Sequence, residues 1–212
     1  MARPPLDGIY LVTDTALCAK RGIEPTVHAA LKGGVRVVQY RDKTNDEARR
    51  RKEAAALARI CQEHGATFLV NDDIALAAES GADGVHVGKD DAALETARER
   101  LGPGAIIGVS CYNEFSRAEA AARAGADYIA FGSVFPSPTK PDAPRAPLAL
   151  FEQARAQLDI PVCAIGGIDQ RNIQQVAASG AHLFAVITAL LDADDITAAA
   201  ARLNERIALA RG

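Results

Sequence analysis

Eight short apolar runs alternate along this chain with segments of helical spacing, and no other feature constrains its fold as strongly. The runs are rich in β-branched residues, as buried strands are, whereas the segments between them are rich in Ala, Glu and Arg. The predicted strands are 8–13, 35–40, 67–71, 84–87, 105–110, 128–132, 160–164 and 182–188, and clear helical segments are 45–63, 91–101 and 114–124. Eight strand–helix units with right-handed crossovers predict a parallel sheet that closes into an α/β fold of the (β/α)8 TIM-barrel type.

Length and composition fit one such barrel. The chain has 212 residues, at the short end of the range of about 200 to 250 that these barrels need, so we expect a single domain over residues 1–212. A hydrophobic content of 49% supports a large core, and only 5% aromatic residues with abundant alanine fit closely packed helices.

Charge, hydropathy and cysteine spacing exclude several functions. A net charge of −3 gives no electrostatic reason to expect a nucleic-acid partner. No apolar stretch approaches the roughly 18 residues that span a membrane, and the N-terminal segment lacks the apolar run of a signal peptide. The four cysteines are scattered, without metal-ligand or disulfide spacing. We therefore expect a cytoplasmic protein with no membrane partner.

The second predicted strand ends in a polar cluster. Gln39, Arg41 and Lys43 alternate along the extended chain and so share one face, with Asp42 between them. In a barrel the C-terminal ends of all strands gather on one face, and active sites lie there. Two cations and an amide at this rim favour a bound polyanion.

The next two strands bring carboxylates to the same rim. Asn71 and Asp72 follow the third strand, and Asp90 and Asp91 follow the fourth. Each aspartate could cap the following helix instead, because Asp is favoured at the N-cap. Beside the cations, however, they favour a divalent cation held by carboxylates and phosphate oxygens, which is Mg2+ chemistry. His86 lies inside the fourth strand, and we expect a packed histidine.

Two later strand ends add hydrogen-bonding groups. Ser110 ends the fifth strand as a neutral donor. The sixth strand runs into the longest irregular and proline-rich stretch of the chain, in which Ser137, Thr139 and Lys140 suit phosphate oxygens. Long loops in compact domains are usually lids or binding loops.

The last two strand ends suggest a phosphate cradle. Gly166 and Gly167 follow the seventh strand, and Ile187 and Thr188 end the eighth. Backbone N–H groups after these strands form the recurrent phosphate site of such barrels, and glycine allows close approach. The rim thus carries two anion sites, which suggests two phosphorylated substrates joined by displacement of pyrophosphate.

Seven ordered motifs make the chain resemble the thiamine-phosphate synthase family over essentially its whole length. They are VQYRDK (38–43), LVND (69–72), GVHVGKDD (84–91), GVS (108–110), FGSVFPSPTK (131–140), IGGI (165–168) and VIT (186–188). The resemblance implies a transferase that condenses hydroxymethylpyrimidine diphosphate with thiazole phosphate, forming thiamine phosphate and releasing pyrophosphate.

Carried over residue by residue, the resemblance also implies a site. Pyrimidine diphosphate would be held by Gln39, Tyr40, Arg41, Asp42, Lys43, Asn71, Ser110 and Lys140. Thiazole phosphate would be held by Ser137, Pro138, Thr139, Gly167, Ile187 and Thr188. Mg2+ would lie at Asp72 and Asp91, which is the only reason to prefer Asp91 over Asp90. The residues expected to act on the leaving diphosphate are Arg41, Lys43, Ser110 and Lys140.

Two other functions stay open at this point. An isomerase like the related thiazole tautomerase would share the barrel and the phosphate cradle but would not need the cation and carboxylate sets. A non-catalytic regulator that binds a phosphorylated ligand is the second alternative. In each case the expected partners are small phosphorylated molecules, and a homo-oligomer is left open.

Overall fold

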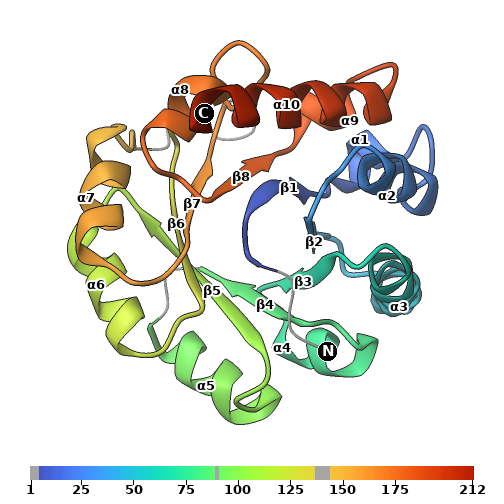
Figure 1. Cartoon of the computed structure of the whole chain (residues 1–212). Helices are drawn as coiled ribbons and strands as arrows, with labels where there is room; N and C mark the ends of the chain where they lie inside the picture. The colour runs from blue at the N-terminus through green and yellow to red at the C-terminus, as the bar shows by residue number, and fades with distance from the viewer. Residues whose placement is uncertain (1–4, 89–90, 137–143) are drawn as a thin grey trace.

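Eight parallel strands close into a barrel, as the alternation of the sequence predicts (Figure 1). The computed structural model describes residues 5–88, 91–136 and 144–212. Each strand pairs with its neighbours in sequence, and β8 closes the barrel against β1. The strands are β1 Gly8–Val12, β2 Val37–Tyr40, β3 Thr67–Asn71, β4 Gly84–Val87, β5 Ile106–Tyr112, β6 Tyr128–Phe131, β7 Val162–Ile165 and β8 Leu183–Val186.

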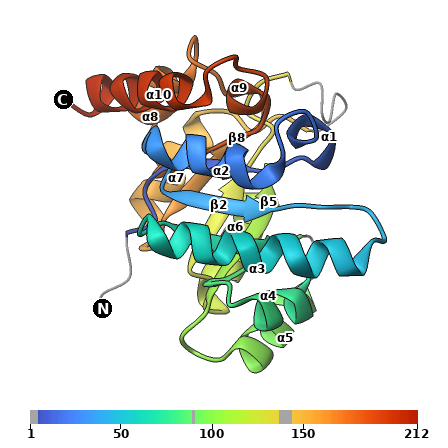
Figure 2. The same ribbon diagram turned by 90° about the vertical axis from the view of Figure 1, so that its right-hand side faces the viewer.

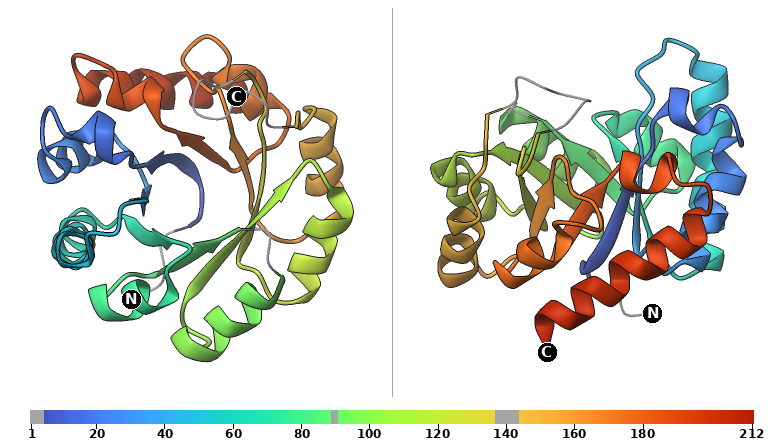
Figure 3. Two further views of the ribbon diagram at one scale, coloured as in Figure 1. Left: turned by 180° about the vertical axis from the view of Figure 1, so that it is seen from behind. Right: turned by 90° about the horizontal axis from the view of Figure 1, so that it is seen from above.

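Helices surround the barrel on every side (Figures 1 and 3). They are α1 Thr15–Cys18, α2 Ile23–Lys32, α3 Glu47–Glu63, α4 Ile74–Ser80, α5 Asp91–Leu101, α6 Phe115–Arg123, α7 Ala149–Gln157, α8 Ile173–Ala178, α9 Thr188–Leu191 and α10 Ile196–Arg211. The sequence predicts eight helices, and the structure adds the short α1 and α9, which directly follow β1 and β8. None of the helices in these ranges is both long and apolar enough to cross a membrane.

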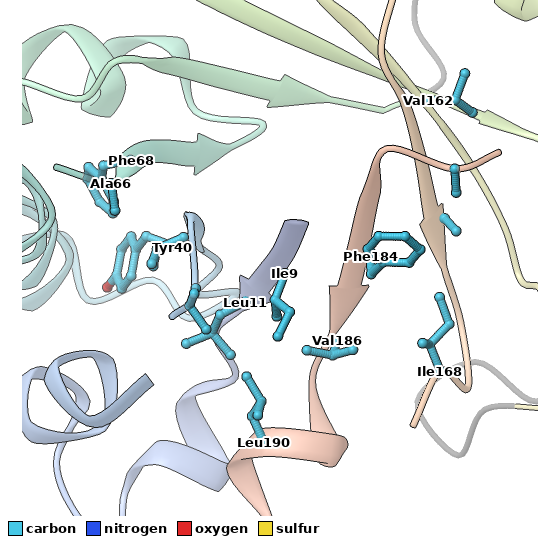
Figure 4. Close-up of a cluster of buried hydrophobic side chains, with 14 of the residues drawn as sticks. Ile9, Leu11, Tyr40, Ala66, Phe68, Val162, Ile168, Phe184, Val186 and Leu190 are labelled. Carbon is cyan, nitrogen blue, oxygen red and sulfur yellow. The ribbon is translucent and has the colours of Figure 1, made fainter. Parts of the chain in front are cut away.

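The strands separate two apolar layers because successive side chains point to opposite faces. Ile9 and Leu11 of β1 pack outward against the helices, together with Phe184 and Val186 of β8 (Figure 4). Tyr10 of β1 points inward and belongs to the small cluster inside the barrel. The same alternation decides which side chains at each strand end can reach the inside.

The two ends of the barrel differ in what they carry. In Figure 2 the β2 arrow points away from the side on which both ends of the described chain lie. The C-terminal ends of the strands, where the sequence places its polar clusters, therefore form the opposite rim. The predicted site and the ends of the described chain therefore lie at opposite ends of the barrel.

Candidate active site

One pocket opens at the C-terminal ends of the strands and extends into the barrel. Inward-facing side chains from β1, β2, β4 and β5 line its inner part, and the loops after β6, β7 and β8 line its rim. Seven residues predicted from the sequence line it, namely Gln39, Arg41, Asn71, Ser110, Gly167, Ile187 and Thr188. The structure thus brings the two predicted anion sites together in one pocket.

Polar side chains at the end of β2 point alternately toward the pocket and toward the outer helices. Gln39 and Arg41 face the pocket. Tyr40 instead packs into the outer layer beside Phe68 (Figure 4), and its hydroxyl donates to Glu53 at 2.8 Å. The Asp42 side chain is likewise removed from solvent and is bound by Arg49. Both side chains therefore point toward α3. The assignment of Tyr40 and Asp42 to the substrate site stays a prediction, and their backbone is the part left for such a contact.

This arrangement leaves the rim of β2 with positive charge. Burial opposes ionisation of Asp42, but hydrogen bonds from the Thr44 backbone and from Arg49, at 2.6 Å, outweigh it and lower the pKa to about 2. The Asp42 charge is thus already balanced by Arg49. Arg41 and Lys43 form no ion pair with any residue in the described ranges. Arg41 lines the pocket and can meet an anion there, whereas Lys43 is exposed and is not among the pocket-lining residues.

Asp72 lies at the rim between β3 and β4. Its backbone is left-handed, with φ of 60°, and Asn71 Nδ2 donates to its Oδ2 at 2.7 Å. Its other carboxylate oxygen faces Gly88, since a Cβ placed on that glycine would lie 3.7 Å from Oδ1. Asp72 does not cap the following helix. The N-cap of α4 is Asp73, whose side chain accepts from Leu76 N. Asp72 is exposed.

The second predicted metal ligand is only partly described. Asp91 begins α5, but its side chain lies outside the described residues, as does all of Asp90. Groups of three or more His, Cys, Asp or Glu side chains suited to a metal ion are absent from the part of the chain whose placement is described. The exposed Asp72 carboxylate beside Gly88 fits a cation that takes its remaining ligands from phosphate and water.

Four more residues predicted for the site lie outside the described residues. They are Ser137, Pro138, Thr139 and Lys140, in the loop between β6 and α7. Their assignments stay predictions.

The sequence alone did not reveal a hydrogen-bonded set of side chains of which Tyr10, Gln39, His86 and Ser110 line the pocket. His86 is 9% exposed, and its ring nitrogens lie 2.7 Å from the Tyr128 hydroxyl and 2.9 Å from the Ser110 hydroxyl. The Tyr128 hydroxyl in turn lies 2.9 Å from that of Tyr10, which accepts from Gln39. The expected packed histidine is confirmed, but it packs through polar contacts that reach the pocket.

Burial of His86 links the stability of the fold to pH. Desolvation outweighs the nearby Asp72 charge and lowers the pKa of His86 from 6.5 to about 4. Between these values the unfolded chain binds a proton that the native state excludes, so the free energy of unfolding falls as pH falls. The expected loss from pH 6.5 to 4 is about 3 kcal/mol for this group. Above pH 6.5 its contribution is fully present.

Urea unfolding of the wild type and His86→Gln across this range measures the effect. The wild type should lose more stability than the variant as pH falls. His64→Gln, which changes an exposed histidine, controls for the loss of an imidazole. Equal slopes for the wild type and His86→Gln would contradict the assignment.

The predicted phosphate cradle is built from the ends of β7 and β8. Gly166 and Gly167 have φ of 104° and 62°, which side chains rarely adopt. Asn172 Nδ2 donates to Gly167 O at 2.8 Å and fixes this turn. Ile187 is the N-cap of α9 and supplies no side-chain cap. Within the described ranges, the N–H groups of Gly167 and Thr188 donate to no other residue, so both can bind an anion.

Known proteins resemble this chain over nearly its whole length. A family model described as thiamine monophosphate synthase matches residues 9–190. A thiamine-phosphate synthase from Halorhodospira halophila is 52% identical over 198 residues, which cover 93% of this chain and 93% of that protein. One from Chromobacterium violaceum is 52% identical over 199 residues, or 94% of this chain and 95% of that protein. The solved structure of thiamine phosphate pyrophosphorylase from Pyrococcus furiosus has a TM-score of 0.88 at 33% identity, with 98% of both chains covered.

Proposed function

Because this chain belongs to the thiamine-phosphate synthase family, its activity is the formation of thiamine phosphate from a pyrimidine diphosphate and a thiazole phosphate, and we propose how the pocket carries it out. The proposal is based mainly on one observation, which is that the residues of two candidate anion sites line the same pocket. Arg41 lines it on the β2 side, and the Gly167 and Thr188 backbone lines it on the β7–β8 side. The two substrates would bind at these two places, with their reacting carbon and nitrogen between them.

The β2 side would stabilise the leaving group. The bond between the pyrimidine methylene carbon and the diphosphate oxygen breaks first, and the electron pair leaves with the diphosphate. Arg41 and Lys43 meet the negative charge that gathers there. A unit charge pair about 4 Å apart at an effective dielectric constant near 20 is worth roughly 4 kcal/mol. Lys140, whose position is not described, is proposed to act with them, as is the Ser110 hydroxyl.

The β7–β8 side would orient the nucleophile. With its phosphate held on the backbone of Gly167 and Thr188, the thiazole presents its ring nitrogen to the pyrimidine methylene cation and forms the new C–N bond. A general base is not needed, because the nitrogen lone pair is already free. The pocket therefore acts by orientation and by charge stabilisation.

We propose that Asp72 and Asp91 hold Mg2+ against the diphosphate. When bound there, the ion supplies positive charge to the leaving oxygens. Asn71 would keep the Asp72 carboxylate oriented through its 2.7 Å hydrogen bond. All four cysteines are buried as thiols, which supports our proposal of a reducing, cytoplasmic location.

The alternatives are not supported. A tautomerase-like isomerase does not need the cations at the end of β2, and a regulator needs no leaving-group site. The curated relatives named above are synthases.

The test mixes the purified chain with hydroxymethylpyrimidine diphosphate, thiazole phosphate and Mg2+, and measures pyrophosphate and thiamine phosphate. Product should require both substrates and should be lost with EDTA. Product that persists in EDTA would remove the metal from the proposal. Tight binding of thiazole phosphate without product would restore the isomerase or regulator alternative.

Gly167→Ala is expected to weaken the thiazole phosphate site. A Cβ at this position would lie 2.4 Å from Pro136 O and 2.8 Å from Phe135 Cβ, so the β6–α7 segment would have to move. We expect the KM for thiazole phosphate to rise about tenfold or more, with a smaller change for the pyrimidine diphosphate.

Gly65→Ala is the matched control for that change. Gly65 has nearly the same φ, 64°, but an added Cβ there meets nothing within 4 Å. It should cost about 1 kcal/mol of stability from backbone strain and leave both KM values unchanged. Similar KM values in the two variants would argue against a thiazole phosphate site at Gly167.

A further inference from the structure

Two histidines meet on the outside of the barrel, between α2 and α3. These helices pack against each other, and Figure 2 shows them side by side. His28 lies within α2, and His64 is the C-cap residue of α3. The Nδ1 atom of His28 lies 3.2 Å from Nε2 of His64, and the ring planes are inclined by 66°. The other two histidines of the chain, His86 and His182, have hydrogen-bond partners elsewhere.

The pair lines an open groove of about 980 Å³ between α2, α3 and α10. His28 is half-buried and His64 is exposed, so a dissolved ion can reach both rings. In the part of the chain that the structure describes, this groove shares no lining residue with the active-site pocket. A ligand bound here would therefore not occupy the substrate site.

The distance between the two ring nitrogens suits one shared metal ion. Zn2+ binds histidine nitrogen at about 2.0 to 2.1 Å with tetrahedral geometry, which places two ligand nitrogens about 3.3 to 3.4 Å apart. The observed 3.2 Å corresponds to an angle of about 100° at such an ion. An ion with 90° between neighbouring ligands would need a separation of about 2.9 Å. The separation in this structure is closer to the tetrahedral value.

Little has to change in the protein for the ion to enter. Without a metal, one ring donates its N–H to the other, and the two nitrogens share that proton. Zn2+ needs a lone pair from each nitrogen, so the donating ring has to carry its proton on its other nitrogen. The backbone of His28 is held within α2, and the His64 N–H binds Ile60 O at 3.2 Å. Most of the cost of ordering the two ligands is thus met by the fold.

Other charged side chains also line the groove. They are Glu24, Lys32, Arg49, Lys52 and Glu53. Arg49 is bound to Asp42, and Glu53 accepts from the Tyr40 hydroxyl. Glu24, His28 and Lys32 are four residues apart on α2 and therefore share one face of the helix. The Glu24 charge favours a cation at His28, whereas the Lys32 charge opposes it.

We propose that His28 and His64 form a binding site for Zn2+ that ties α2 to α3. Imidazole nitrogen suits Zn2+, whereas Mg2+ prefers oxygen ligands, so this site differs in kind from the one proposed at Asp72. A group of three or more metal-binding side chains is absent from the described residues, and water would complete the coordination. The proposal does not depend on the proposed function.

The test is a calorimetric titration of the untagged chain with Zn2+, in excess Mg2+ that occupies the carboxylate site. The wild type should bind one Zn2+ per chain. His28→Gln and His64→Gln should each weaken binding about 100-fold, because the second histidine then no longer acts as an intramolecular ligand. At a Zn2+ concentration 100 times the wild-type Kd, the wild-type Tm should rise by about 5 to 10 °C and that of either variant by about 1 °C.

Two control variants make the result specific. Lys32→Gln changes an exposed cation of the same groove and should keep or tighten Zn2+ binding, because a nearby positive charge opposes the ion. Asp72→Asn should bind Zn2+ as the wild type does.

Three results would overturn the proposal. They are a wild type that binds no Zn2+, a Zn2+ affinity that survives in either histidine variant, and a loss of Zn2+ binding in Asp72→Asn. Synthase activity is measured separately, so the failure of this proposal and that of the proposed function can be told apart.

Discussion

Asp72→Asn is expected to lower turnover by about a thousandfold or more at saturating substrate. The substitution keeps the size of the side chain and an oxygen that can accept from Asn71, but it removes the charge. Asp72 is the exposed carboxylate at the rim beside Gly88, and a carboxylate is the ligand that Mg2+ needs most. Without the ion, the leaving diphosphate loses a large share of its charge stabilisation.

Activity measured against Mg2+ concentration checks this prediction, together with Mn2+ binding followed by electron paramagnetic resonance in the presence of pyrophosphate. Asp73→Asn is the control, because Asp73 caps α4 and pairs with Arg50 at 2.7 Å. Asparagine caps as well as aspartate does, so this variant should lose at most about 1 kcal/mol of stability and little activity. Near-normal turnover and Mn2+ binding in Asp72→Asn would remove the metal site from this rim.

The fold could be predicted because its signal is repeated along the chain. All predicted strand limits lie within two residues of the observed ones, since each apolar run is bounded by polar or glycine residues. The added helices α1 and α9 have four residues each and bury too little to leave an apolar pattern. The alternation of β2 also placed Gln39 and Arg41 on the pocket side, whereas Lys43, predicted for the same face, is exposed and does not line the pocket.

The site was less predictable where a side chain's role depends on distant partners. Tyr40 and Asp42 entered the predicted site through a motif, and the strand alternation turns both toward Glu53 and Arg49 instead. Tyr10 and Tyr128 look like core residues in apolar strands. Their hydroxyls meet across 118 positions of sequence, and only the barrel register brings them together. The only indication in the sequence was that each of these tyrosines carries a polar hydroxyl within an apolar strand.

Arg41→Gln is expected to lower kcat by about 100- to 1000-fold, which corresponds to the loss of one preorganised charge at a developing anion. Arg41 lies at the pocket end of β2, and Asp42, the nearest carboxylate in sequence, is already bound by Arg49. Arg41 therefore forms no ion pair with a neighbouring carboxylate among the described residues. Because the charge on the leaving group grows as its bond breaks, kcat should fall more than the affinity for the pyrimidine diphosphate does.

Arg36→Gln provides the matched control at the other end of β2. Arg36 is exposed at the opposite end of the barrel, just before β2 begins, and its loss changes the net charge of the protein by the same amount. It should leave kcat and both KM values near those of the wild type. If Arg41→Gln raised only the KM for the pyrimidine diphosphate, Arg41 would bind the ground state and the transition state equally. Stabilisation of the leaving group would then have to come from Lys43, Lys140 and the metal ion.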